Sequence, residues 1–198
     1  MLYLQKFSNL TLILYGEKMK ISEAQQEVRT VYLGAFSGMI VTSAIWLISS
    51  AAGKWISTGY AIMALILGGT FIFPLSQLLL KAMGRPATLS KENPFGMLAM
   101  QIAFTIPASY PLIAAATIHN TNWFYPAFLV VVGAHYLPFI FLYGMWQFAI
   151  LTVLLVGLGT AIGIYFPDSF TLGGWVGATI YLLSAFPFRA IALSRKEE

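Results

Sequence analysis

Long apolar stretches alternate with short charged segments along this chain. Four stretches contain no Asp, Glu, Lys or Arg, namely residues 30–53, 55–80, 93–167 and 169–188. A helix needs about 20 predominantly apolar residues to cross a bilayer. The stretches at 30–53, 55–80 and 169–188 fit one such helix each. The longest stretch, 93–167, fits three helices joined by short turns. We predict an all-α fold, a polytopic membrane helical bundle with six transmembrane helices at about 31–50, 59–80, 95–118, 123–143, 146–166 and 172–192.

Composition narrows the class of protein further. Only 9% of the 198 residues are charged and 59% are hydrophobic, whereas about 25% of the residues in a soluble domain are charged. The chain has no cysteine, which excludes thiol catalysis, disulfides and thiolate metal sites. We expect no cofactor. The net charge of +4 is explained by membrane topology, so we expect no nucleic-acid partner.

The basic residues predict an orientation. If the N-terminus is cytoplasmic, six spans place ten of the 11 Lys and Arg residues on the cytoplasmic side, and only Lys54 lies outside. Such a bias is the positive-inside rule. We therefore expect a multi-pass protein of the cell inner (cytoplasmic) membrane with both termini in the cytoplasm.

The first 18 residues stand apart from the regular pattern. Gly16, Glu17 and Lys18 before Met19 can be encoded by a ribosome-binding sequence, so Met19 is one candidate for the true start. A short cytoplasmic arm is the alternative. Residues 19–198 form one predicted domain, in which Ser22 and Gln25 have the spacing of a capping box for a helix that runs on into the first span.

One ionisable side chain, His135, lies within the apolar stretch "VVVGAHYLPFIFLYGMWQF" at residues 130–148. At 1.5 Å per residue it lies roughly 18 Å from Trp123 and roughly 12 Å from Tyr143, which mark the two predicted interfaces. It is therefore expected inside the hydrocarbon, toward the cytoplasmic leaflet. An ionisable group at this depth is a functional candidate by default.

Further polar side chains are predicted at similar or shallower depth in the same leaflet. They are Gln101, Thr105, Gln77, Gln147 and the neighbouring Tyr136. A polar group facing lipid has no partner, so we expect a cleft open to the cytoplasm with His135 at its floor. Pro138 and Pro74 would each free a backbone carbonyl near it. Hydrogen bonding that only joins neighbouring helices is the alternative for this cluster.

Other features have plainer interpretations. Lys81, Arg85 and Lys91 are candidates for binding anionic lipid headgroups. Glycines spaced four residues apart, such as Gly34 and Gly38, predict close helix packing. The two histidines differ too much in depth to share a metal ion, and the acidic residues all lie in tails or loops, so no metal site is expected.

The stretches "GAHYLPFIFLYGMWQF", "NWFYPAF" and "MGRPATLSKENP" resemble an uncharacterised family of small bacterial six-span integral membrane proteins. The resemblance covers roughly Met19 to Leu193. It implies a six-span bundle and transfers no catalytic residue, because the family carries no known activity.

Three functions are consistent with the sequence. The first is binding or transport of a small or amphipathic molecule through the cleft at His135. The second is a non-enzymatic structural or regulatory subunit that docks on a membrane protein or on a second copy of itself. The third is a lipid-modifying enzyme with His135 as acid and base. We rank them in this order, because absent intramembrane carboxylates argue against catalysis.

Overall fold

The computed structural model describes residues 19–194, and the predictions made for residues 1–18 lie outside this range. The described residues form helices joined by short turns, with no strand among them. The helices are α2 (Ile21–Tyr32), η1 (Leu33–Ala35), α3 (Phe36–Trp55), α4 (Thr58–Ala82), α5 (Phe95–Ala108), α6 (Tyr110–His119), η2 (Thr121–Trp123), α7 (Phe124–His135), α8 (Leu137–Tyr143), α9 (Gln147–Tyr165) and α10 (Leu172–Ser194).

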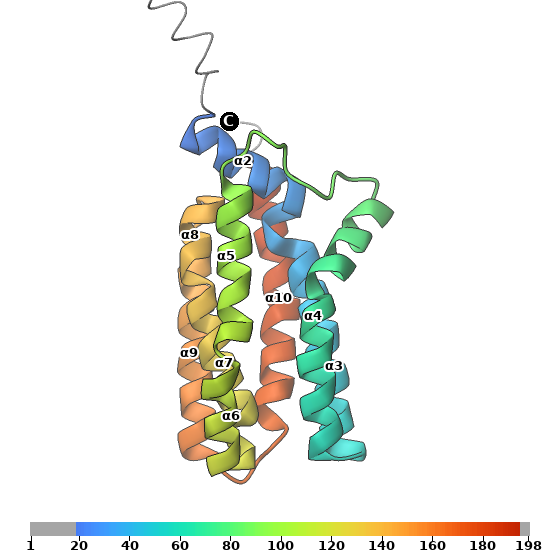
Figure 1. The fold of residues 1–198 in the computed structure, drawn as a ribbon, viewed down its shortest axis with the longest axis vertical. Coiled ribbons are helices and arrows are strands. Elements are labelled where there is room, and N and C mark those ends of the chain that lie inside the picture. Colours follow the sequence, from blue (N-terminus) through green and yellow to red (C-terminus); the bar gives the residue numbers. More distant parts are fainter. Residues whose placement is uncertain (1–18, 195–198) are drawn as a thin grey trace, which may run out of the picture.

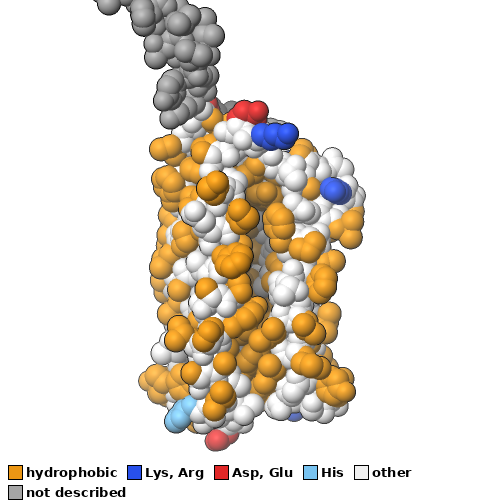
Figure 2. All heavy atoms as spheres, in the orientation of Figure 1, with side chains coloured by type: hydrophobic (Ala, Val, Ile, Leu, Met, Phe, Trp, Pro, Cys, Tyr) orange, Lys and Arg blue, Asp and Glu red, His pale blue; other side chains and the backbone are white. Residues whose placement is uncertain are grey.

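The predicted six-span bundle is confirmed. Six helical segments are long and apolar enough to cross a membrane: Ile21–Trp55, Thr58–Ala82, Phe95–His119, Thr121–Tyr143, Gln147–Tyr165 and Leu172–Ser194. They run along the long axis of the molecule (Figure 1). On the face shown in Figure 2, charged side chains gather at the two ends and a broad apolar band lies between them. The chain is an integral membrane protein.

The start of the first helix differs from the prediction. Ser22 does not cap it, because the helix begins at Ile21 and its N-cap is Lys20. The carboxylate of Glu23, three residues after the cap, accepts a hydrogen bond from the backbone N–H of Lys20 at 3.1 Å. Glu23 fills this place because it is the third residue after the cap, and its carboxylate also interacts favourably with the positive end of the helix dipole.

α2 does not continue straight into the first span, as the sequence predicted. Leu33, Gly34 and Ala35 have φ values of 51°, 64° and 69°, a left-handed conformation that non-glycine residues adopt rarely. This turn ends α2 and starts α3 at Phe36. α2 therefore lies across one end of the bundle (Figure 1), which we call the α2 end. Twenty residues remain in α3, enough to cross a bilayer.

The bundle has two tightly packed groups of helices. α3 packs along α4 and α10, and α7 packs along α9. Small residues permit these approaches: a Cβ on Gly177 of α10 would lie 2.5 Å from the Trp46 ring, and one on Gly159 of α9 would lie 2.9 Å from the carbonyl oxygen of Pro126. The predicted role of the spaced glycines in close packing is thus observed within one chain.

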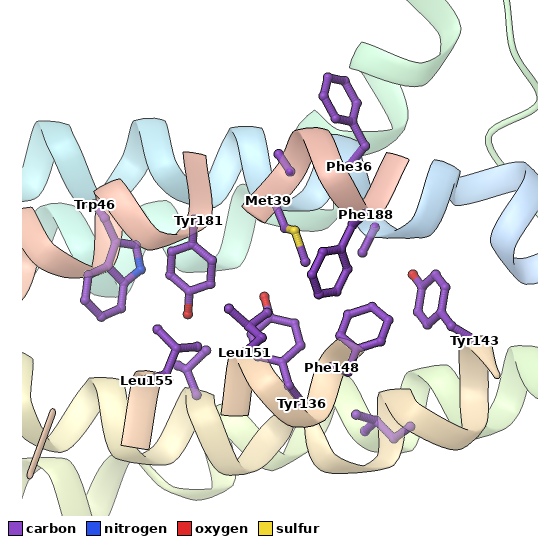
Figure 3. Close-up of a cluster of buried hydrophobic side chains, with 14 of the residues drawn as sticks. Phe36, Met39, Trp46, Tyr136, Tyr143, Phe148, Leu151, Leu155, Tyr181 and Phe188 are labelled. Carbon is purple, nitrogen blue, oxygen red and sulfur yellow. The ribbon is translucent and has the colours of Figure 1, made fainter. Parts of the chain in front are cut away.

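Large buried side chains fill the space between the two groups. Figure 3 shows Phe36, Met39, Trp46, Tyr181 and Phe188 on one side facing Tyr136, Tyr143, Phe148, Leu151 and Leu155 on the other. Trp46 is only 2% exposed and contacts the rings of Tyr125, Phe128 and Tyr181 at centroid distances of 5.8–6.0 Å. Dispersion and edge-to-face ring contacts therefore hold the centre of the bundle together.

Two spans lie at the periphery and do not pack along each other. α4 packs along α3, whereas α5 and α6 pack on α7 and α8. Figure 2 shows a hollow between α4 and the α5–α6 segment, lined by apolar side chains and open to the side of the bundle. In a membrane, this hollow faces the lipid.

Candidate functional site

Two of the spans are broken near their middle, and both breaks follow from proline. α5 ends at Ala108 and α6 begins at Tyr110, with Pro107 and Pro111 on either side. α7 ends at His135 and α8 begins at Leu137, with Pro138 at its second position. Proline has no N–H and clashes with the preceding turn, so each break leaves backbone carbonyls without their helical partners. Broken helices in a bilayer are tolerated where other groups satisfy these carbonyls.

His135 is held at the second break by a hydrogen bond to Thr105 of α5, with 2.9 Å between Nδ1 and Oγ1. The Thr105 hydroxyl also bonds the carbonyl oxygen of Ile102 at 2.7 Å. It has one hydrogen, which it donates to that carbonyl, so it accepts from the Nδ1–H of His135. A base that activates a hydroxyl would need the opposite direction of hydrogen bonding. The pair links two helices.

Aromatic rings surround the imidazole. The rings of Tyr136 and Phe139 lie 5.7 Å and 5.1 Å from it, centroid to centroid. His135 itself is half-buried, and Tyr136 is buried and stacks on Phe148 in the core. The structure thus brings together three of the predicted site residues, His135, Thr105 and Tyr136.

The three glutamines of the predicted site each have a different environment. Gln101 is exposed on α5, one turn before Thr105. Gln77 of α4 donates to the carbonyl oxygen of Ala87 at 3.2 Å and so anchors the α4–α5 loop. The Oε1 atom of Gln147 is buried without a hydrogen-bond partner within residues 19–194. A shared ligand for all six predicted residues stays a prediction.

The end of the bundle at which the sequence predicted an opening is covered by α2. Gln25 donates to the carbonyl oxygen of Phe141 at 2.6 Å, and Arg29 donates to that of Tyr143 at 2.7 Å. Both carbonyls lie in the last turn of α8, where that of Phe141 also accepts from the N–H of Gly144 at 3.2 Å. Two polar side chains of α2 therefore cap α8 and hold α2 across it.

The predicted headgroup residues lie at this same end. Lys81 and Lys91 are exposed. Arg85 is half-buried and donates from its guanidinium to the carbonyl oxygen of Thr30 at 3.1 Å, so it attaches the α4–α5 loop to α2. Arg85 thus makes a structural contact, and headgroup binding by Lys81, Arg85 and Lys91 stays a prediction.

A cavity that the sequence did not reveal lies between α4, α6 and α7. Its volume is about 230 Å³, and its lining residues are Ile62, Ile66, Tyr110, Ile113, Ala114, Thr117, Ile118 and Phe124. Neither His135 nor Thr105 lines it. Sequence periodicity could not find it, because residues that face a cavity in the membrane are as apolar as residues that face lipid.

Among the ionisable groups of the described residues, a metal site would need a set of ligands that lie close together. Within residues 19–194, no three side chains of His, Asp or Glu lie together in a way that could hold a metal ion. The polar groups in and around the second break are therefore hydroxyls, the His135 imidazole and backbone carbonyls.

Comparison with known proteins gives a family but no activity. No curated protein and no solved structure matches the chain. A family of unknown function, DUF7010, matches residues 21–189, which is most of the chain. Its range begins with α2 and ends within α10. The chain therefore belongs to DUF7010, a family of unknown function.

Proposed function

We propose that this membrane protein binds a small, mainly apolar molecule that enters from the bilayer into the cavity between α4 and α6. The observation that carries the proposal is the separation of two neighbouring peripheral spans. α4 and α6 each pack on the core, leaving about 230 Å³ between them. Apolar pockets with a few polar groups are the usual form of small-molecule sites.

The lining favours a ligand of low polarity. Six of the eight lining residues are aliphatic or phenylalanine side chains, and the other two are Tyr110 and Thr117. The Thr117 hydroxyl donates to the carbonyl oxygen of Ile113 at 2.7 Å. Its hydrogen is thus already engaged, and the cavity wall offers little to a charged molecule, whose desolvation would not be offset.

The path of entry follows from the position of the cavity. The hollow in Figure 2 opens between the spans, and Ile62 and Ile66 of α4 line the cavity. A molecule dissolved in the bilayer therefore reaches the cavity without leaving the hydrocarbon. Whether binding leads on to transport depends on a second conformation.

His135 supplies a second place where a ligand could be held. It is half-buried, and its Nε2 is the acceptor of the ring once Nδ1–H donates to Thr105. The polar cleft predicted there from the sequence remains a proposal. The cleft at His135 and the cavity between α4 and α6 are formed by different residues. Substitutions in one therefore leave the other intact and distinguish the two places.

A docking subunit is the second candidate function. The tightly packed aromatic centre around Trp46 and Tyr181 (Figure 3) favours it, because a rigid core leaves little internal space for a transported molecule. In that case, the exposed hollow between α4 and α6 would be covered by a partner helix instead of a small molecule.

Native mass spectrometry of protein released from lipid nanodiscs tests the binding proposal. Ala114→Phe fills the cavity from its wall, and Ala115→Phe, at the next residue, adds the same ring to an exposed position outside the cavity. We expect a bound small molecule with wild type and Ala115→Phe, and its loss with Ala114→Phe. Equal adducts in all three proteins, or none in the wild type, would overturn the proposal.

A further inference from the structure

The Tyr110 side chain is the one polar feature of the cavity whose hydrogen is not already engaged. The ring packs against Phe128 with a centroid distance of 6.1 Å. Its hydroxyl lies 3.8 Å from the position that a Cβ on Gly69 of α4 would take. It therefore reaches across the gap between the two spans.

The hydroxyl has no hydrogen-bond partner within the part of the chain that the structure describes, whereas Thr105, Thr117 and Ser109 all bond backbone carbonyls of their own helices. A hydroxyl without a partner in an apolar environment is less stable than one that donates to an acceptor. An acceptor on a bound molecule would remove this difference.

The position of Tyr110 fixes which end of the ligand must carry that acceptor. Tyr110 lies eight residues from Ile118, which is roughly 12 Å along α6 toward the middle of the bilayer. Ile118 is next to the helix end at His119. The free phenol thus lies at the deep end of the cavity, and the membrane interface lies at the other.

This arrangement excludes one common occupant. A phospholipid with its headgroup at this interface would place the terminal methyl of an acyl chain at Tyr110, and a methyl group is no acceptor. A compact apolar molecule with a carbonyl or ether oxygen at the end beside Tyr110 would satisfy the phenol and leave its other contacts apolar.

We infer that the cavity selects a compact apolar ligand with a carbonyl-type acceptor, which the Tyr110 hydroxyl binds at the deep end. The inference rests on the proposed function, since it needs the cavity to be occupied by a small molecule. It adds the chemical class of the ligand and names Tyr110 as the residue that determines specificity.

Two probes of matched shape test it: 2-methyl-1,4-naphthoquinone and 2-methylnaphthalene, which differ in two carbonyl groups. Their affinities are measured by saturable displacement of a fluorescent naphthalene derivative from the protein in nanodiscs. Wild type should prefer the quinone by about five- to tenfold, the usual worth of one hydrogen bond. Tyr110→Phe keeps the ring and should remove this preference while leaving the affinity for 2-methylnaphthalene unchanged.

Each other outcome has a definite meaning. Equal binding of the two probes to the wild type, or a preference that survives in Tyr110→Phe, would overturn the inference and leave the cavity as a binding site. Absence of saturable binding by either probe, with Ala114→Phe identical to wild type, would overturn the proposed function and the inference with it.

Discussion

The Glu27 carboxylate of α2 accepts a hydrogen bond from the Asn93 amide at 2.8 Å, which joins α2 to a residue two positions before α5. The same carboxylate accepts from the backbone N–H and the hydroxyl of Ser90, at 2.5 Å and 2.9 Å. Asn93 also donates to the carbonyl oxygen of Ala24 at 3.1 Å and accepts from the N–H of Phe95 at 2.9 Å. One acidic residue and one amide thus fasten α2 to the α4–α5 loop and cap α5.

This carboxylate makes the stability of the α2 end depend on pH. Burial by itself raises the pKa of Glu27, but the hydrogen bonds from Ser90 and Asn93 outweigh it and hold the pKa below its ordinary value of 4.5. A group whose pKa is lowered on folding stabilises the fold above its unfolded pKa. That contribution is lost as the pH falls below about 4.5 and through the folded pKa.

Thermal unfolding in detergent between pH 7 and pH 3 checks this expectation, with Glu27→Gln as the reference. At pH 7, the variant should be less stable by no more than about 1 kcal/mol, because solvent screens a partly exposed group. The difference between the two proteins should shrink as the pH falls. A difference independent of pH would show that the charge of Glu27 contributes nothing to folding.

The turn between α2 and α3 gives a sharper prediction. A methyl group at Gly34 would lie 2.6 Å from the carbonyl oxygen of Phe188, and Gly34 has a φ of +64°. Gly34→Ala combines a backbone clash with a left-handed conformation, so we expect a loss of about 2–4 kcal/mol in the free energy of unfolding. Chemical denaturation in mild detergent measures it.

Gly38 is the matched control, since it lies four residues further on, in the first turn of α3, and a Cβ there would meet nothing closer than Ser76 Oγ at 3.9 Å. Gly38→Ala should be neutral or stabilising by up to about 1 kcal/mol, because alanine has the higher helix propensity. If the two variants behaved alike, the left-handed turn would not be a feature of the folded protein.

The buried pair Ser49 and Tyr125 predicts unequal effects of two conservative changes. The Ser49 hydroxyl donates to the carbonyl oxygen of Ala61 at 2.8 Å, so the Tyr125 hydroxyl, 2.6 Å away, is the donor to Ser49. Tyr125→Phe removes one donor and leaves Ser49 satisfied. Ser49→Ala removes the acceptor of a buried phenol and should cost about 1 kcal/mol more than Tyr125→Phe, measured by unfolding of both variants. Equal losses would contradict this direction of hydrogen bonding.

The sequence was sufficient for the spans and insufficient for their packing. The thickness of the bilayer sets how long an apolar, charge-free helix must be to cross it. The third span, expected at 95–118, is accordingly found at Phe95–His119. The left-handed turn at Leu33 and Ala35 could not be predicted, because neither residue type favours a positive φ. The turn is fixed by the close packing of Gly34 against the backbone of Phe188, which lies far away in the sequence. His135 and Thr105 were both candidates for the site, but their pairing depends on how α5 and α7 are rotated toward each other.

The hydrogen bond between His135 and Thr105 gives the last prediction, which also separates the two proposed places for a ligand. His135→Ala and Thr105→Val should each destabilise the bundle modestly, and the double variant should lose less than the sum. We expect a coupling of about 0.6 kcal/mol, as found for hydrogen bonds between membrane helices. The double-mutant cycle is measured by unfolding in detergent.

In native mass spectrometry, the adduct should survive in both single variants, because neither residue lines the cavity. Loss of the adduct in His135→Ala, with retention in Thr105→Val and Ala114→Phe, would instead place the ligand on the imidazole, as the sequence first suggested.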